Sequence, residues 1–222
     1  MRKLFSMLLV FSIIFTAIPT TALAEETPTG EISMAGSNIR VEGNAGLRFR
    51  ATVNKNEFFD KYYPTTDANK TYRYKESNNL IFGMLLIPKN LVGSGQTIVK
   101  LFESGNDKVV DVTAKKMLEQ DKDTVSFTGV ITSIPENSKS YSREIIAVSY
   151  MKYREDAESE WNYIYANQII NSYYNVAKAA RNSTYSDTNN PSPSTAVKSI
   201  MKKLDEIIDL VDDNVGWIDG WY

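Results

Sequence analysis

Serine, lysine and carboxylate side chains are the candidates for chemistry in this chain of 222 residues, because it contains neither histidine nor cysteine. A Ser-His-Asp triad, a Cys-His pair and the usual nitrogen and sulfur ligands of zinc are excluded, and so are disulfide bonds. Three kinds of chemistry remain open: paired carboxylates as in glycoside hydrolysis, a Ser/Lys dyad, and calcium held by oxygen ligands.

The motif S-x-x-K, which holds the acylating serine of penicillin-interacting enzymes, occurs twice. The first copy, Ser149 and Lys152, falls in a predicted strand, where residues three positions apart point to opposite faces. The second copy, Ser199 and Lys202, falls on a predicted helix, but no K-T-G or S-D-N motif accompanies it. We therefore predict that the protein is not an enzyme.

Carboxylates cluster in one charged stretch, which comprises Glu155, Asp156, Glu158 and Glu160. A catalytic pair needs shielding from water to separate its two pKa values, whereas this stretch has the composition of a solvated hairpin loop. We interpret it as a loop. A small carboxylate-based glycan hydrolase is the alternative, enzymatic function.

Oxygen ligands for calcium gather near the C-terminus at Asp212, Asp213 and Asp219. They are weak candidates, because their spacing is not that of an EF-hand loop. We expect no bound metal and no other cofactor.

Aromatic residues give the strongest binding signal. Trp161, Tyr163 and Tyr165 alternate along a predicted strand and therefore share one face, which can stack on sugar rings or fill a protein interface. Packing in the core is the competing interpretation. Three further aromatic residues at the C-terminus can dock on a partner or back on the parent domain: Trp217, Trp221 and Tyr222.

The N-terminus has the pattern of a secretory signal peptide, with a short basic segment, an apolar run and the small residues Ala22 to Ala24. We expect cleavage before Glu25 and a protein that is secreted or associated with the cell surface.

No second apolar run is long enough to span a membrane. The net charge of −2 argues against nucleic acid as a partner.

Hydrophobic periodicity predicts a mainly β chain. Strand patterns cover 38–41, 46–54, 79–88, 97–102, 108–114, 124–134, 143–153 and 160–167, and the 79–88 run is apolar enough to be covered on both faces. Short helical patterns cover 55–64 and, as a helix or loop, 115–123. Residues 168–180 form an amphipathic pattern with Asn167 as its candidate N-cap, and a second apolar stripe runs from Ser194 to Val211.

These elements predict an antiparallel β-sandwich-like domain with a trailing helix and a second C-terminal amphipathic helix. The expected parts are a signal peptide at 1–24, a linker at 25–38, the sandwich-like domain at 39–182, a linker at 183–193, and the C-terminal helix with its aromatic tail at 194–222. We expect that last helix to cover the domain itself rather than wait for a partner.

Five stretches occur in the order of a known module: "GLRF" at 46–49, "FGMLLIP" at 82–88, "FTGVITSIP" at 127–135, "REIIAVSYMKY" at 143–153 and "YANQIINSYYNVAKAA" at 165–180. This set resembles a β-rich module of secreted and cell-surface multidomain proteins of Gram-positive bacteria. The resemblance implies a surface location and a sandwich-like fold, but no chemistry.

The arginine inside "GLRF" recurs in that module, which implies a structural role for Arg48 with a fixed partner, such as a strand-end carbonyl or Glu144. Arg50 is expected to face solvent.

The predicted function is that of a non-catalytic binding or interaction module for an extracellular glycan or a surface protein. A purely structural spacer is a further alternative.

Overall fold

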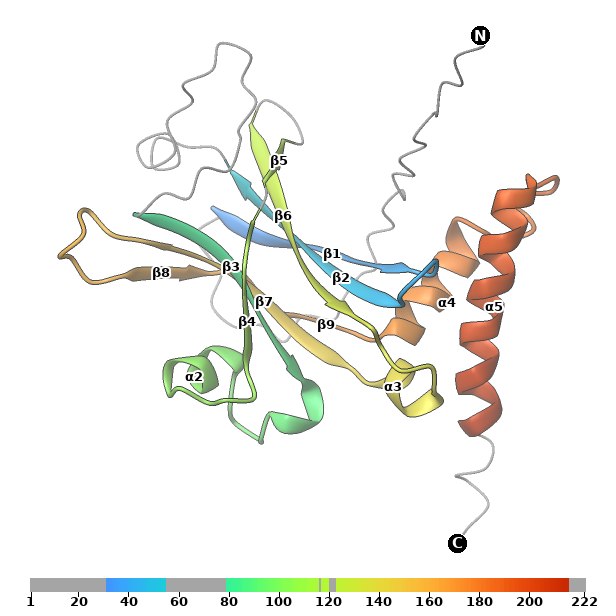
Figure 1. Cartoon of the computed structure of the whole chain (residues 1–222), viewed down its shortest axis with the longest axis horizontal. Helices are drawn as coiled ribbons and strands as arrows, with labels where there is room; N and C mark the ends of the chain where they lie inside the picture. The colour runs from blue at the N-terminus through green and yellow to red at the C-terminus, as the bar shows by residue number, and fades with distance from the viewer. Residues whose placement is uncertain (1–30, 55–78, 116, 120–122, 216–222) are drawn as a thin grey trace, which may run out of the picture.

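The computed structural model describes residues 31–54, 79–115, 117–119 and 123–215 (Figure 1). The expected signal peptide, the short helical pattern at 55–64 and the aromatic tail lie outside the described residues. Within them, no helix is both long and apolar enough to cross a membrane.

Two antiparallel sheets form the body of the molecule. The first sheet has the order β1 (Ile32–Arg40), β2 (Gly46–Asn54), β6 (Thr124–Thr132) and β5 (Leu118–Glu119). The second has the order β4 (Val110–Thr113), β3 (Leu80–Pro88), β7 (Ile145–Tyr153) and β8 (Asn162–Tyr165), and β9 (Ile169–Asn171) also pairs with β7. The mainly β, antiparallel prediction is confirmed.

The core lies between the inner faces of the two sheets. In β2 the alternation puts Leu47, Phe49, Ala51 and Val53 inward, all at most 1% exposed. Met84 of β3 reaches across to β6, where a Cβ at Gly129 would lie 2.7 Å from its sulfur atom. Gly129 therefore lets the two sheets approach closely.

The second sheet is buried on both faces, as the apolar run at 79–88 predicts. Phe82 and Met84 of β3 point into the core, whereas Leu85 and Ile87 point outward and are also fully buried. The outer residues pack against α2 (Ile98–Glu103), which follows the short helical turn η1 (Lys89–Leu91).

Helices α3 (Ser138–Ser142), α4 (Tyr173–Ser183) and α5 (Thr195–Val215) gather at one end of the sandwich, opposite the β7–β8 hairpin (Figure 1). Ser194 caps α5, because its Oγ accepts the Val197 amide at 3.4 Å. The apolar stripe of α5 joins the core through Leu204, Ile207 and Val211. The C-terminal helix therefore covers the domain itself, as expected.

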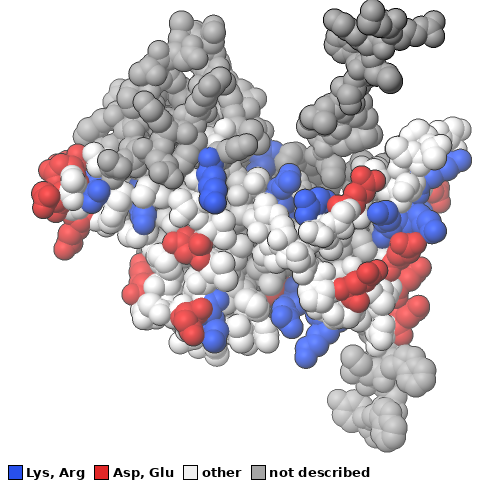
Figure 2. Space-filling model, in the orientation of Figure 1, with Lys and Arg blue, Asp and Glu red and all other residues white. Residues whose placement is uncertain are grey.

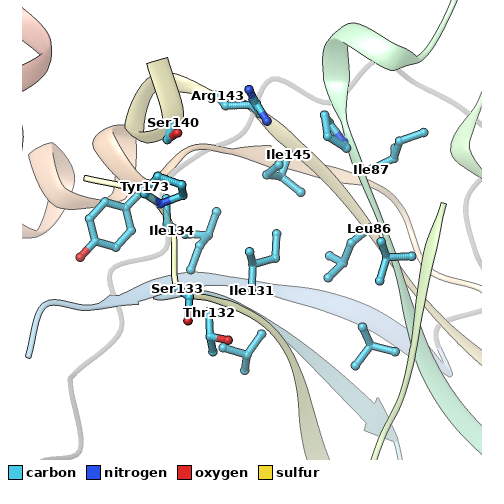
Figure 3. Close-up of a pocket in the computed structure, with 16 residues that line it drawn as sticks. Leu86, Ile87, Ile131, Thr132, Ser133, Ile134, Ser140, Arg143, Ile145 and Tyr173 are labelled. Carbon is cyan, nitrogen blue, oxygen red and sulfur yellow. The ribbon is translucent and has the colours of Figure 1, made fainter. Parts of the chain in front are cut away.

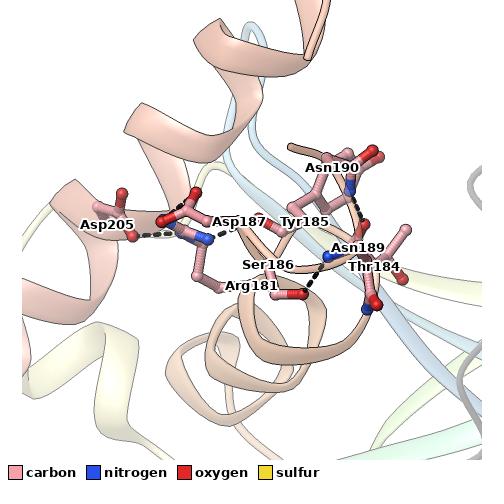
Figure 4. Close-up of polar contacts among 8 residues, drawn as sticks. All are labelled: Arg181, Thr184, Tyr185, Ser186, Asp187, Asn189, Asn190 and Asp205. Atoms are coloured by element: carbon pink, nitrogen blue, oxygen red, sulfur yellow. Dashed lines mark hydrogen bonds and ion pairs between the residues drawn. The ribbon is translucent and has the colours of Figure 1, made fainter. Parts of the chain in front are cut away.

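The expected linker at 183–193 is a folded turn that ties α4 to α5. Arg181 donates from Nε to Asp205 at 2.7 Å and from a terminal nitrogen to the Tyr185 carbonyl at 2.5 Å. The side-chain amide of Asn190 donates to the Thr184 carbonyl just after α4 (Figure 4), and that of Asn189 donates to the Ser183 carbonyl at the end of the helix. Polar composition predicted a linker here, but these side chains satisfy the backbone locally.

The expected linker at 25–38 is wrong over 32–38, which belongs to β1. A β-bulge between Met34 and Ser37, with Gly36 at φ +105°, interrupts the alternation of this strand and so removes its signal in the sequence. Residues 118–119 are likewise a strand, held by pairing with β6, rather than a helix or loop.

Two further predictions are wrong in type. Residues 98–103 form α2 rather than a strand, because Thr97 caps the helix and Ile98 and Leu101 bury one helical face.

Asn167 is not an N-cap, since Ile169–Asn171 is strand β9. Ser172 caps α4 instead, its Oγ accepting the Asn175 amide at 3.0 Å. The adjacent pair Ile169 and Ile170 fits either periodicity, and pairing with β7 decides it.

Candidate functional site

An aromatic cluster covers part of the outer face of the second sheet. Antiparallel pairing of β7 with β8 places Tyr165 opposite Tyr150 and Tyr163 opposite Lys152. Phe102 of α2 closes the cluster from the side, with its ring centroid 6.1 Å from those of both Tyr150 and Tyr163. We call Phe102, Tyr150, Tyr163 and Tyr165 the tyrosine face.

Tyr150 is the buried base of the tyrosine face. Its ring lies over Gly83 of β3, so close that a Cβ there would stand 2.3 Å from a ring atom. Its hydroxyl donates to Asp111 of β4 at 2.8 Å. One side chain therefore connects three neighbouring strands, and only glycine at position 83 leaves room for it.

Tyr163 and Tyr165 are the outer layer of the tyrosine face. Their rings stack at 5.7 Å with an interplanar angle of 12°. Tyr163 is 37% exposed and Tyr165 is half-buried. The shared face expected from their alternation is therefore present, and Tyr163 offers the accessible ring.

The ring of Trp161, the third residue of the predicted set, contacts two positively charged side chains. The Arg154 guanidinium carbon lies 4.6 Å from its ring centroid, and Lys152 Nζ lies 5.0 Å away. These cation–π contacts stiffen the base of the hairpin. Lys152 Nζ also lies 5.8 Å from the ring centroid of Tyr163, so this cation borders both rings.

Acidic groups set the electrostatics of the tyrosine face. Burial, and then the Asp111 carboxylate, raise the pKa of Tyr150 and of Tyr163 above the usual value. Burial and Glu103 do the same for the pKa of Tyr165. The Tyr150 hydroxyl already donates to Asp111, so the outer phenol of Tyr163 is the donor that a ligand can reach, and the exposed side chains of Asp111 and Glu103 can accept.

The acidic stretch at 155–160 forms the tip of the β7–β8 hairpin, where acidic side chains gather at one extremity of the molecule (Figure 2). Asp156 accepts the amides of Glu158 and Ser159, each at 2.9 Å, and the Ser159 hydroxyl at 2.8 Å. These hydrogen bonds lower the pKa of Asp156. The stretch is a solvated turn, as interpreted from the sequence.

Neither S-x-x-K pair forms a dyad. Ser149 is fully buried in the core, and Lys152 lies on the opposite face of β7 over Trp161. Ser199 is exposed on α5, and Lys202 pairs with Glu206 at 3.7 Å.

Of the two calcium candidates that the structure describes, Asp212 serves the contact between α4 and α5. Asp212 accepts the Tyr174 hydroxyl at 2.5 Å and lies 3.8 Å from Lys178, and Asp213 is exposed. Asp219 lies outside the described residues, as do Trp217, Trp221 and Tyr222. Across the described ranges, no group of three acidic side chains is arranged to hold a metal ion.

The partner expected for Arg48 is wrong. Glu144 binds Lys89, at 2.7 Å. Arg48 is exposed on β2, and the described part of the chain shows no hydrogen bond or ion pair of its side chain. Arg50 is the half-buried arginine, and burial lowers the pKa of its guanidinium, contrary to the expected solvent exposure.

Sequence reasoning missed four members of the site: Gly83, Phe102, Asp111 and Tyr150. The available signal was a glycine inside the continuous apolar run "LIFGMLLIP", which indicates a close approach by another group. That signal does not say which group approaches. The register of β3 with β7 is needed, because it sets Tyr150 opposite Gly83.

Fold and site together define an antiparallel β-sandwich domain with a closely packed, partly exposed tyrosine face. No protein-family model and no curated protein sequence matches the chain. Among solved structures, the chain is similar to the full-length major pilin SpaD from Corynebacterium diphtheriae, at 12% sequence identity and a TM-score of 0.23. The match covers 64% of this chain and 34% of the pilin, so the chain spans about a third of that protein's length.

Proposed function

We propose that the protein is a secreted, non-catalytic module of the cell surface that binds an extracellular glycan through the tyrosine face. The observation that carries the proposal is the stacked pair of Tyr163 and Tyr165 on the outer side of the second sheet. Sugar rings have apolar faces that pack on aromatic rings and hydroxyls that need hydrogen-bonding partners. The phenols and the carboxylates of Asp111 and Glu103 supply such partners.

The tyrosine face is rigid, which favours binding. Tyr150 is anchored below by Gly83 and Asp111, and Phe102 supports it from α2. A site built on a sheet and held by packed neighbours loses little conformational entropy when a ligand arrives. The exposed Tyr163 ring is therefore presented in one orientation.

The location rests on the signal-peptide pattern at 1–24 and on the resemblance to a module of Gram-positive surface proteins. Both are features of the sequence alone. N-terminal sequencing of secreted protein should find Glu25 as the first residue; secreted chains that begin with Met1 would remove the basis for this location.

Binding rather than hydrolysis is favoured by the exposure of the two carboxylates. Asp111 and Glu103 both face water, whereas the catalytic carboxyl groups of glycoside hydrolases are shielded from it. Asp111 already accepts the Tyr150 hydroxyl. We infer that these groups orient sugar hydroxyls.

A glycan array probed with the mature protein tests the proposal. Tyr163→Ala should weaken binding by about tenfold, because it removes the exposed ring, while Tyr163→Phe should retain most of the affinity. Absence of binding to every glycan would favour the structural spacer. Release of sugar products that stops in Asp111→Asn would instead favour the hydrolase.

A further inference from the structure

The two sheets separate at one side of the sandwich and leave an apolar cleft of about 420 Å³ between β4 and β6. We call it the edge cleft. Leu86, Ile131 and Ile145 point toward its centre, and Arg143 lies at its rim (Figure 3). A volume of this size is within the usual range of about 300–1,000 Å³ for binding pockets.

Among the described residues, the outer strand of the first sheet covers only a small part of β6, and the edge cleft lies beside the uncovered part. β4 pairs with β3 so that Val110 is opposite Leu86 and Val112 is opposite Met84, which places both valines on the core side. Nevertheless Val110 is 55% exposed. The strand that would cover it, β5, has two residues and lies beside Val125 and Ser126, further along β6.

In the part of the chain that the structure describes, the rest of β6 is an open sheet edge. Phe127 to Thr132 pair with β2 on one side, and among the described residues no strand pairs with them on the other. An open edge presents unpaired backbone N–H and C=O groups, which are a template for a further strand. A strand added there would lie over Val110 and Val112 and bury them.

The charge at the cleft determines which kind of peptide strand it can bind. Of the described residues that line it, Arg143 alone is charged; its side chain is exposed and forms no ion pair with any described carboxylate. Its neighbour Glu144 is bound to Lys89. The cleft is thus complementary to an apolar strand with an acidic end.

We propose that the edge cleft receives an extended peptide segment of another protein, with aliphatic side chains at alternate positions and a carboxylate at the end that meets Arg143. The segment pairs with β6 beyond β5, and its inward side chains fill the space above Val110. This site is separate from the tyrosine face, and the proposal does not depend on glycan binding.

A peptide titration tests the proposal with the full mature chain. The probe is a fluorescently labelled peptide of alternating threonine and valine with an aspartate at each end, and its binding is followed by fluorescence anisotropy. We expect saturable binding that Val110→Asp weakens by at least about tenfold and Arg143→Gln by several-fold. Leu91→Asp is the matched control, because Leu91 is an aliphatic residue 46% exposed outside the cleft, and it should change nothing.

Residue-resolved amide hydrogen exchange shows whether the peptide pairs with the sheet edge. In the free protein, alternate amides of 127–132 should exchange fast because they face the open side, and bound peptide should slow them. A probe whose backbone N–H groups are all methylated lacks the donors for pairing and should bind poorly.

Several results would overturn the proposal. These are absence of saturable binding, binding that survives Val110→Asp, or binding without protection of 127–132. Full protection of 127–132 in the free protein would assign the edge to another segment of the same chain, such as 216–222. Protection that appears only with a concentration-dependent doubling of mass would assign it to a second copy.

Discussion

Tyr150 and Gly83 form one interlocked pair, in which the ring of the tyrosine occupies the space that any side chain at position 83 would need. The two residues are directly opposite in the β3–β7 ladder. The ring can therefore lie flat across β3 and bring its hydroxyl to Asp111 on β4. The tyrosine face rests on this pair.

Gly83→Ala should destabilise the protein. The added methyl group would overlap the Tyr150 ring, which is fully buried and cannot move aside without displacing its neighbours. We expect the free energy of unfolding to fall by about 2 kcal/mol. The melting midpoint should fall by about 4–8 °C, measured by circular dichroism or calorimetry.

Gly93→Ala is the matched control for that substitution. Gly93 lies in an exposed turn, and the atom nearest to an added Cβ is the end of the flexible Gln96 side chain, at 3.0 Å. The control should shift the midpoint by no more than about 2 °C. Equal shifts for the two variants would contradict the interlocked pair.

The hydrogen bond between Tyr150 and Asp111 should be measurable by a double-mutant cycle. Tyr150→Phe and Asp111→Ala each remove one partner of a 2.8 Å contact. We expect a coupling energy of about 1 kcal/mol, from urea denaturation of the two single variants and the double variant. Strictly additive losses would mean that the bond contributes nothing to stability.

Alkaline pH should destabilise the protein through its tyrosines. Burial raises the pKa of Tyr150, Tyr165 and Tyr173 in the folded state above the ordinary value near 10. The folded state therefore binds these protons more tightly than the unfolded state. The contribution of these tyrosines to the free energy of unfolding is fully present below about pH 10. It falls as the pH rises further, because the tyrosines of the unfolded chain lose their protons first.

The measurement is the melting midpoint as a function of pH, with tyrosinate absorbance recorded in parallel. Tyr150→Phe should reduce the slope above about pH 10, whatever the lysines contribute, because it removes one group that differs between the two states. A slope unchanged by this substitution would show that Tyr150 ionises as readily in the folded protein.

Helix α5 should contribute directly to the stability of the domain. Leu204 is 1% exposed and packs in the common core, so Leu204→Ala should cost about 3 kcal/mol in free energy of unfolding. Lys198→Ala on the exposed side of the same helix should change stability by less than about 0.5 kcal/mol. A chain lacking 192–222 that melts like the full mature chain would refute this role.

Strands with strict local patterns were predictable from the sequence. The alternation in "GLRFRATVN" and the continuous apolar run at 79–88 correspond to β2 and β3, because the side-chain period of a strand is carried by adjacent residues. The stripe from Ser194 to Val211 similarly predicted α5 and its cap. In the candidate site, the same local rule placed Tyr163 and Tyr165 on one face.

Segments without a regular hydrophobic pattern take their secondary structure from the strands that pair with them. A bulge interrupts the alternation of β1, whereas β5, with two residues, and β9, at Ile169–Asn171, are too short to show a pattern of their own. Each is held by hydrogen bonds to a partner strand. Short segments take the structure that long-range pairing stabilises, since their own propensities differ by a fraction of a kcal/mol per residue.

The sequence by itself determined which side chains are present for catalysis or binding. It also determined the strands and helices that have a regular hydrophobic pattern along adjacent residues. Tertiary structure alone decided that Tyr150 meets Gly83 and Asp111, that Arg50 rather than Arg48 is half-buried, and that Val110 is left uncovered. Strand order and register create these relationships between residues far apart in the chain, and no local pattern encodes them.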